Sequence, residues 1–337
     1  MTERRLLRRS DIPTLFASLL AAGIRIIDPI RKDGRISYEA VKSADKLELG
    51  EASSRESAKT AVFPRYEELF RFRHRDRDVE VDDHLPDPEP TVLFGVHPCD
   101  AAALTILRMV FTNGSSDPHI DSKLDATTVV ALSCQKPDEY CFCTSVGGGP
   151  SDTRGSDVLL TQLDDERLLV EAVTEKGAAL LSRTQNLMPP TDAIPPPPAK
   201  LPARFNTVTL GPRLAGRFND AAVWTEQSLR CLGCGACAYA CPTCSCFDVQ
   251  SESNRAGGVN LRCWDSCGFG QFTLHASGHN PRARQFERWR QRILHKFSYQ
   301  PDRLGVLGCV GCGRCSRACP VDMNIAEHVQ ELAETTP

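Results

Sequence analysis

The chain has 337 residues, 41% of them hydrophobic and 25% charged, which is enough to bury the cores of two or more domains. Its 43 acidic and 40 basic residues give a formal net charge of −3, so no excess of positive charge favours a nucleic acid or an anionic membrane as partner. Sixteen cysteines are too dilute for a small disulfide-stapled domain, and their clustering indicates metal binding instead.

The N-terminal segment combines four arginines with the apolar stretch that follows them, a pattern also found in export signals. Leu15, Phe16 and Leu19 fall on one helical face, however, and Pro13 suits a first helical turn. We therefore predict an amphipathic surface helix that begins after Ser10 or Asp11 and ends at Gly23. No stretch reaches the roughly 18 apolar residues that a membrane span requires. The abundance of thiols then indicates a cytoplasmic protein.

Apolar patterning between residues 24 and 183 predicts an alternation of strands and helices. Strands are expected at 24–30, 35–38, 91–96, 127–132, 158–163 and 167–173, and helices at 100–111 and 174–183. Residues 43–90 mix charges with scattered aromatic anchors, which favours a surface helix followed by a loop. The strand, helix and strand between residues 91 and 132 suggest a right-handed parallel unit. We therefore expect an α+β or α/β domain with a parallel sheet at its core.

Prolines concentrate between residues 188 and 202, including four in a row at 195–198. Such a segment is typical of a stiff, extended linker, and we place a domain boundary there. The expected organisation is an N-terminal domain at 1–187, a linker at 188–202 and a second domain at 203–337. Helical patterns at 214–230, 280–297 and 325–334 suggest that this second domain is mainly helical.

A cysteine motif occurs twice beyond the proline-rich segment. Each copy has three cysteines spaced by two residues and a fourth that precedes a proline: Cys231, Cys234, Cys237 and Cys241, then Cys309, Cys312, Cys315 and Cys319. This spacing is the ligand pattern of a [4Fe–4S] cluster, and two copies predict two clusters in a ferredoxin-like domain. In two-cluster ferredoxins the fourth cysteine binds the other cluster, which pairs Cys319 with the first copy and Cys241 with the second. Zinc sites are the alternative, but zinc usually takes two ligand pairs separated by a longer gap.

Four further cysteines lie in the long insertion between the two copies, at Cys244, Cys246, Cys263 and Cys267. Cys244 and Cys246 flank one serine and would point to opposite sides of an extended chain, which is unfavourable for gripping a single ion. Buried structural thiols are therefore the favoured interpretation, and another metal site is the alternative.

The helical stretch at 280–297 is strongly basic and carries Arg282, Arg284, Arg288, Arg290, Arg292 and Lys296. The simplest interpretation is a solvated helix face. The alternative is a docking surface, or a set of counter-charges for anionic clusters.

The N-terminal domain has four cysteines of its own. Cys99 and Cys134 each follow one of the predicted parallel strands, and Cys141 and Cys143 share a short loop. The carboxyl ends of parallel strands meet at one sheet edge, where open α/β folds bind ligands. We therefore predict that the four thiols converge on a third [4Fe–4S] cluster, with separate buried cysteines as the alternative. No nucleophile elbow, Walker loop or dinucleotide fingerprint occurs here.

Several short motifs resemble one known family over nearly the whole chain. In the N-terminal half they are 57–59 (Ser-Ala-Lys), 63–67 (Phe-Pro-Arg-Tyr-Glu), 95–100 (Gly-Val-His-Pro-Cys-Asp) and 141–143 (Cys-Phe-Cys). In the C-terminal half they are 241–247, 264–267, 278–282, 295–297 and 308–315. The resemblance is to the family that contains the iron–sulfur subunit of anaerobic sulfite reductase and the beta subunit of soluble sulfhydrogenases.

The resemblance implies an iron–sulfur subunit that passes electrons between a flavin- and NAD(P)-binding subunit and a catalytic subunit. That catalytic subunit differs among family members, which include hydrogenases, sulfite reductases and heterodisulfide-reductase-like assemblies. The eight repeated cysteines carry over as ligands, and the resemblance extends to the four N-terminal ones. The alternative function is a redox enzyme with its own active site in the N-terminal domain, near Cys99 and His97.

Overall fold

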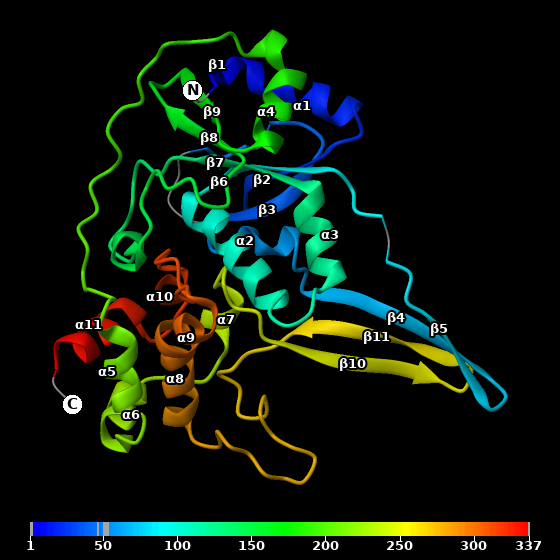
Figure 1. The fold of residues 1–337 in the computed structure, drawn as a ribbon, viewed down its shortest axis with the longest axis vertical. Coiled ribbons are helices and arrows are strands. Elements are labelled where there is room, and N and C mark those ends of the chain that lie inside the picture. The colour runs from blue at the N-terminus through cyan, green and yellow to red at the C-terminus, as the bar shows by residue number, and fades with distance from the viewer. Residues whose placement is uncertain (1–2, 46, 50–53, 86, 336–337) are drawn as a thin grey trace.

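The computed structural model describes residues 3–45, 47–49, 54–85 and 87–335. A seven-stranded sheet in the order β1-β9-β8-β7-β6-β2-β3 organises the N-terminal region (Figure 1). Its four central strands are parallel to one another: β8 (Val158–Gln162), β7 (Thr127–Leu132), β6 (Thr91–Val96) and β2 (Arg25–Lys32). The outer strands β1 (Arg4–Arg8), β9 (Arg167–Ala172) and β3 (Arg35–Val41) are antiparallel to theirs. The predicted parallel core is confirmed.

Helices cover both faces of this sheet, which is why β6 and β7 are almost continuously apolar. The helices α1 (Ile12–Ala21) and α4 (Glu175–Arg183) pack on one face through Leu15, Phe16 and Leu181. On the other face, α2 (Pro98–Phe111) and α3 (Pro118–Ala126) bury Leu104 and Ile120. Because α2 begins directly after β6, this second face also positions the cysteine in the first turn of α2, Cys99.

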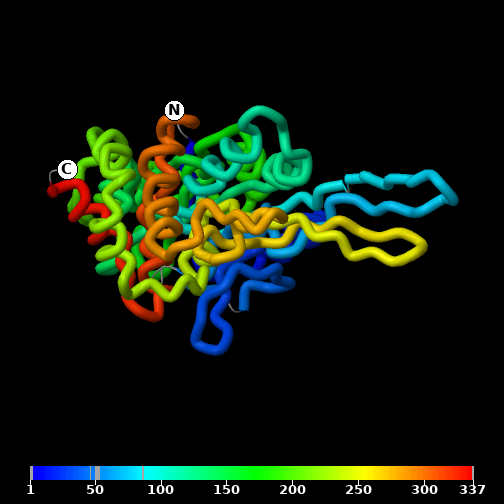
Figure 2. Tube along the Cα trace, turned by 90° about the horizontal axis from the view of Figure 1, so that it is seen from below, coloured from blue at the N-terminus to red at the C-terminus, as the bar shows by residue number. Residues whose placement is uncertain are grey.

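A second, four-stranded sheet joins segments from the two sides of the proline-rich stretch. Its order is β10-β11-β4-β5, from β10 (Phe247–Asn254), β11 (Gly257–Trp264), β4 (Tyr66–Arg75) and β5 (Asp78–Asp82). The sheet forms an arm that projects from the body of the molecule (Figure 2). The prediction of a surface helix within residues 43–90 is therefore wrong for β4. Its charged and aromatic residues alternate as in a strand, and the pairing with β11 decides the conformation.

The C-terminal region is built from short helices around one apolar core. They are α5 (Leu210–Gly216), α6 (Ala221–Ser228), α7 (Ala236–Tyr239), α8 (Gln285–Leu294), α9 (Gln300–Leu304), α10 (Arg314–Arg317) and α11 (Ile325–Glu334), with a π-helical turn at His295–Tyr299. The expectation of a mainly helical arrangement left out the β10–β11 hairpin. Residues 191–204 form no helix or strand and run as an extended strap along one side (Figure 1). Within the described residues, no helix combines the length and apolarity needed to cross a bilayer.

Asp28 on β2 is a fully buried carboxyl group in the middle of this sheet. Neither of its oxygens has a hydrogen-bond partner among the described residues, and burial raises the pKa of Asp28 from 3.8 to about 7. The folded state therefore binds this proton more tightly than the unfolded chain does. The associated stability is fully present below about pH 4 and is lost as the pH rises towards 7.

Replacing Asp28 by asparagine should remove this pH dependence. Because the amide stays neutral, we expect the gain in unfolding free energy from Asp28→Asn to be about 2 kcal/mol larger at pH 8 than at pH 5.5. Urea denaturation of both proteins at the two pH values measures the difference. An equal effect at both values would show that Asp28 has an ordinary pKa.

Candidate metal centres

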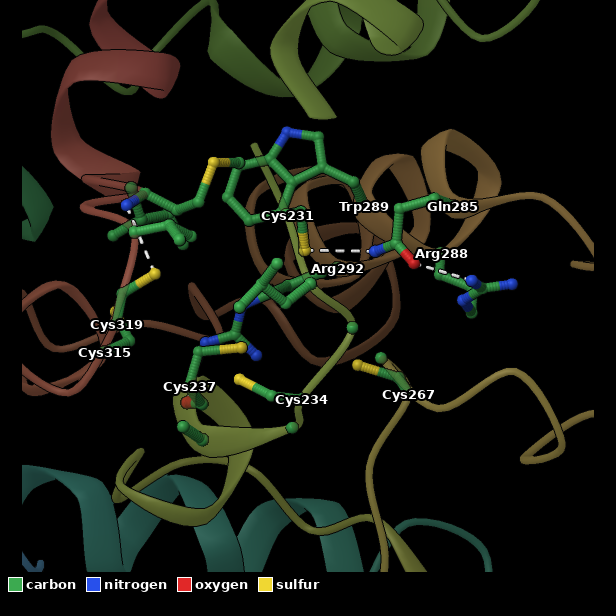
Figure 3. A pocket seen from close by; sticks show the side chains of 18 residues that line it. Cys231, Cys234, Cys237, Cys267, Gln285, Arg288, Trp289, Arg292, Cys315 and Cys319 are labelled. Carbon is green, nitrogen blue, oxygen red and sulfur yellow. Dashed lines mark hydrogen bonds between the residues drawn. The ribbon is translucent and has the colours of Figure 1, made fainter. Parts of the chain in front are cut away.

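The first group of cysteines, called site 1 below, consists of Cys231, Cys234, Cys237 and Cys319. Their side chains line one cavity, shown in Figure 3. Two sulfurs already accept hydrogen bonds. The Gln285 amide donates to Cys231 Sγ at 3.0 Å, and the Met323 backbone N–H donates to Cys319 Sγ at 3.3 Å. The structure thus brings Cys319 to the first copy of the motif, and its role as a ligand stays a prediction.

The second group, called site 2, consists of Cys241, Cys309, Cys312 and Cys315. The thiols of Cys309 and Cys312 each lie within electrostatic reach of Cys241 and Cys315. Burial raises the pKa of Cys309 to about 12, because a thiolate has little access to water here. Buried thiols of this kind become anionic only when a cation or a metal compensates the charge.

The third group, called site 3, consists of Cys99, Cys134, Cys141 and Cys143. All four line one cavity. Cys99 lies in the first turn of α2, directly after β6, and Cys134 follows β7. The predicted convergence of the four N-terminal thiols at the carboxyl edge of the parallel sheet is therefore what the structure contains.

The three sites are neighbours in a row. Cys315 of site 2 also lines the site 1 cavity, and Cys312 of site 2 also lines the site 3 cavity. The loops of sites 2 and 3 touch through their backbones, since the Phe142 N–H donates to the Gly311 oxygen at 2.8 Å. Gly311 has a φ of +65°, and a Cβ atom there would lie 2.5 Å from the backbone of Cys143. Only glycine permits this approach.

The donor sets fit iron–sulfur clusters in number and chemistry. Each site offers four thiols, the ligands that such clusters take. Within the described residues, no three His, Cys, Asp or Glu side chains are arranged to hold one metal ion, and the thiols are instead spread around their cavity walls. In a cubane each thiolate binds a different iron, which requires this wider spacing.

Three buried cations surround the junction of sites 1 and 2. Lys296 places its ammonium 3.3 Å from Cys241 Sγ, and Arg292 donates to Cys244 Sγ at 3.6 Å and to the Cys237 carbonyl at 2.9 Å. Lys59 approaches from the N-terminal region, donates to the Cys244 carbonyl at 3.0 Å and lies 3.8 Å from the centre of the Trp264 ring. Among the described residues, none of the three forms a salt bridge with a carboxylate.

The pKa values of these three cations shift in different directions. Burial lowers the pKa of Lys296, but the thiolates of Cys241 and Cys244 raise it by more, so the pKa ends above its ordinary value. Burial lowers the pKa of Arg292 as well, and thiolates led by Cys237 again outweigh it. For Lys59, burial prevails and the pKa falls. The solvated-face interpretation is thus wrong for Arg292 and Lys296, which are buried among thiols.

Two arginines connect sites 2 and 3. Arg314 of the second motif is fully buried and meets Asp100 of α2 at 2.5 Å. Arg317 reaches Asp138 at 2.5 Å and Cys141 Sγ at 3.5 Å. Both residues belong to the C-terminal region, whereas their carboxylate partners flank the cysteines of site 3. Charge pairing therefore holds the two regions together at the cysteine sites.

The cysteines of the insertion divide into pairs with different partners. The Cys244 thiol lies within electrostatic reach of Cys241 of site 2, and the Cys246 thiol lies within electrostatic reach of Cys267, which lines the site 1 cavity. Cys263 lies on β11, near Asp248, and lines neither cysteine cavity. Cys244 and Cys246 therefore lie beside different cysteines, which agrees with their spacing on an extended chain.

Sequence reasoning did not assign Gln285 or Lys59 to these sites. Gln285 begins α8 and shares a helix face with Trp289 and Arg292, so the spacing of three and four residues was the available signal. Lys59 lies in one of the family motifs, but its contact with the cysteine segment depends on tertiary structure.

Comparison with known proteins adds two findings. Residues 230–323 match the 4Fe-4S dicluster domain family. Over 335 residues the chain is 31% identical to the sulfhydrogenase 2 subunit beta of Pyrococcus furiosus, and the match covers 96% of this chain and 95% of that protein. No solved structure matches the chain significantly.

Proposed function

The chain belongs to the family of the sulfhydrogenase beta subunits, and from this premise we propose that it is the iron–sulfur electron-transfer subunit of a hydrogenase-like oxidoreductase complex. In that complex it relays electrons between a flavin- and NAD(P)-binding subunit and a catalytic subunit. The observation that carries the proposal is the row of three four-cysteine sites, in which neighbouring sites share a wall.

In this proposal the thiols of each site hold one [4Fe–4S] cluster, which when bound supplies a one-electron redox couple. The chain itself does three things. Its apolar core keeps water from most of the thiols, its buried cations offset their negative charge, and its loops fix the distance between neighbouring sites. The contact between Gly311 and Phe142 supports a direct connection between sites 2 and 3.

The test is the iron content of the full-length chain and of two cysteine variants, all purified anaerobically. The wild type should contain about twelve irons and as much acid-labile sulfide, because each cubane holds about four. Cys99→Ser should lose about four irons and one electron paramagnetic resonance signal, since serine is a poor substitute for a thiolate ligand. Cys263→Ser is the matched control, because Cys263 lines neither cysteine cavity, and it should keep all three clusters.

The same measurements distinguish the alternative functions. An active site at Cys99 would leave the iron content of Cys99→Ser unchanged while electron throughput in the complex falls. About eight irons in the wild type would limit the relay to sites 1 and 2. Zinc in place of iron would end the electron-transfer proposal.

A further inference from the structure

One cysteine of site 1 reaches the surface. Of the sixteen cysteines, all within the described residues, Cys234 alone is exposed. Two large apolar side chains stand beside it, uncovered: Leu232, which also lines the site 1 cavity, is 66% exposed, and Leu229 is 75% exposed. Leucine side chains this exposed bury little apolar surface, so they contribute little to the stability of the folded chain.

The charged side chains that line the site 1 cavity have one sign among the described residues. Arg288 and Arg292 line the site 1 cavity, and no Asp or Glu is among the described residues that do so. Arg230, between the two leucines, is exposed, as is Arg284 at the start of α8. Glu287, the nearest acidic residue of α8, accepts the Arg284 backbone N–H and so caps its own helix.

We infer that the surface formed by Leu229, Arg230, Leu232 and Cys234, the site 1 rim, is the docking surface for a one-electron carrier protein with an acidic face. This inference rests on the proposed function and adds an external electron carrier to the two partner subunits of the relay. An apolar centre flanked by arginines is the composition typical of interfaces, and the basic surroundings select an acidic partner. Because Cys234 is the exposed cysteine of site 1, it is the member of this site that a docked partner would approach most closely.

The transfer at this rim is a single-electron exchange. The partner's centre loses one electron and the site 1 cluster gains it, or the reverse, with no bond formed and no proton required. Electrostatic attraction speeds the encounter, so the rate should fall as salt screens the arginines.

The experiment measures how fast a reduced carrier reduces the cluster-loaded full-length chain by stopped-flow absorbance. The probe is a small acidic bacterial ferredoxin, and reduced methyl viologen serves as a small reagent that needs no docking surface. We expect Leu229→Glu, at a residue that does not line the site 1 cavity, to slow reduction by the ferredoxin about tenfold, because the new carboxylate repels the acidic face and removes the apolar contact. Arg230→Glu should act in the same direction.

Val81→Glu is the matched control. It introduces the same carboxylate at an exposed apolar residue of β5, on the projecting arm, which carries no site 1 cysteine. The control should match the wild type with both reagents, and Leu229→Glu should match it with methyl viologen. Equal ferredoxin rates for all proteins, or equal slowing by Val81→Glu, would overturn the docking surface. A wild type without reducible iron–sulfur absorption would instead overturn the proposed function.

Discussion

Replacing Lys296 by methionine should lower the reduction potential of the cluster proposed for site 2 by about 85 mV, because it removes a positive charge 3.3 Å from Cys241 Sγ. Reduction adds one negative charge to the cluster and its thiolates, and a nearby ammonium stabilises the reduced state more than the oxidised one. Unit charges 4 Å apart attract by about 4 kcal/mol at an effective dielectric constant of 20. Spreading the added electron over the cluster reduces this to about 2 kcal/mol, where roughly 1.4 kcal/mol corresponds to 59 mV for one electron.

The measurement is a redox titration followed by electron paramagnetic resonance on the cluster-loaded chain. Lys296→Arg keeps the charge and should keep the potential close to that of the wild type. Lys200→Met removes a lysine charge from the exposed proline-rich segment and should leave all potentials unchanged. If Lys296→Met and Lys296→Arg shift the site 2 potential equally, the ammonium acts through packing and hydrogen bonds to Thr243 and Gly308 rather than through charge.

Arg314→Met should lower the free energy of unfolding by about 3–5 kcal/mol, because it leaves the Asp100 carboxylate buried without its cation. Arg314 meets Asp100 at 2.5 Å and also donates to the backbone and side-chain oxygens of Ser54. Both charged side chains are almost completely shielded from water. A methionine of similar size cannot replace these hydrogen bonds.

Urea denaturation of the cluster-loaded chain measures this loss. The double variant Asp100→Asn with Arg314→Met should recover part of it, since the remaining partner is then neutral. Arg71→Met breaks the exposed Arg71–Glu68 pair and should change the free energy of unfolding little, because solvent screens both charges. A loss for Arg314→Met no larger than that for Arg71→Met would show that the buried pair contributes no more than a surface one.

Local patterns were sufficient for elements whose apolar residues mark a buried face. The strands at Thr91–Val96 and Thr127–Leu132 and the helix at Ile325–Glu334 have the predicted bounds, because a continuous or periodic apolar pattern reflects burial directly. The strands of the arm could not be found in this way. Every residue of β10 is exposed, so its sequence contains no apolar pattern that would indicate a buried strand face. The strand forms because it pairs with β11.

The cysteine sites show the same division. Motif spacing and sheet topology predicted which thiols gather, since both are local or nearly so. The electrostatics of the sites could not be predicted, because Lys59 and Lys296 look like ordinary surface lysines until the fold buries them beside thiols. A basic residue becomes a counter-charge only through contacts between distant segments.

The arm can form only late in the synthesis of the protein. Strand β4 pairs with β11, which the ribosome delivers only after the whole N-terminal sheet and the proline-rich segment have emerged. Until then the nascent chain carries an unpaired strand edge, a feature that invites association with other chains. The final motif, from Cys309 to Cys319, arrives later still and supplies a wall of both cysteine cavities. Sites 1 and 2 therefore gain their last ligands only when this motif has been made, and a chain released earlier has an open strand edge, two incomplete ligand sets and a site 3 cavity that lacks one wall.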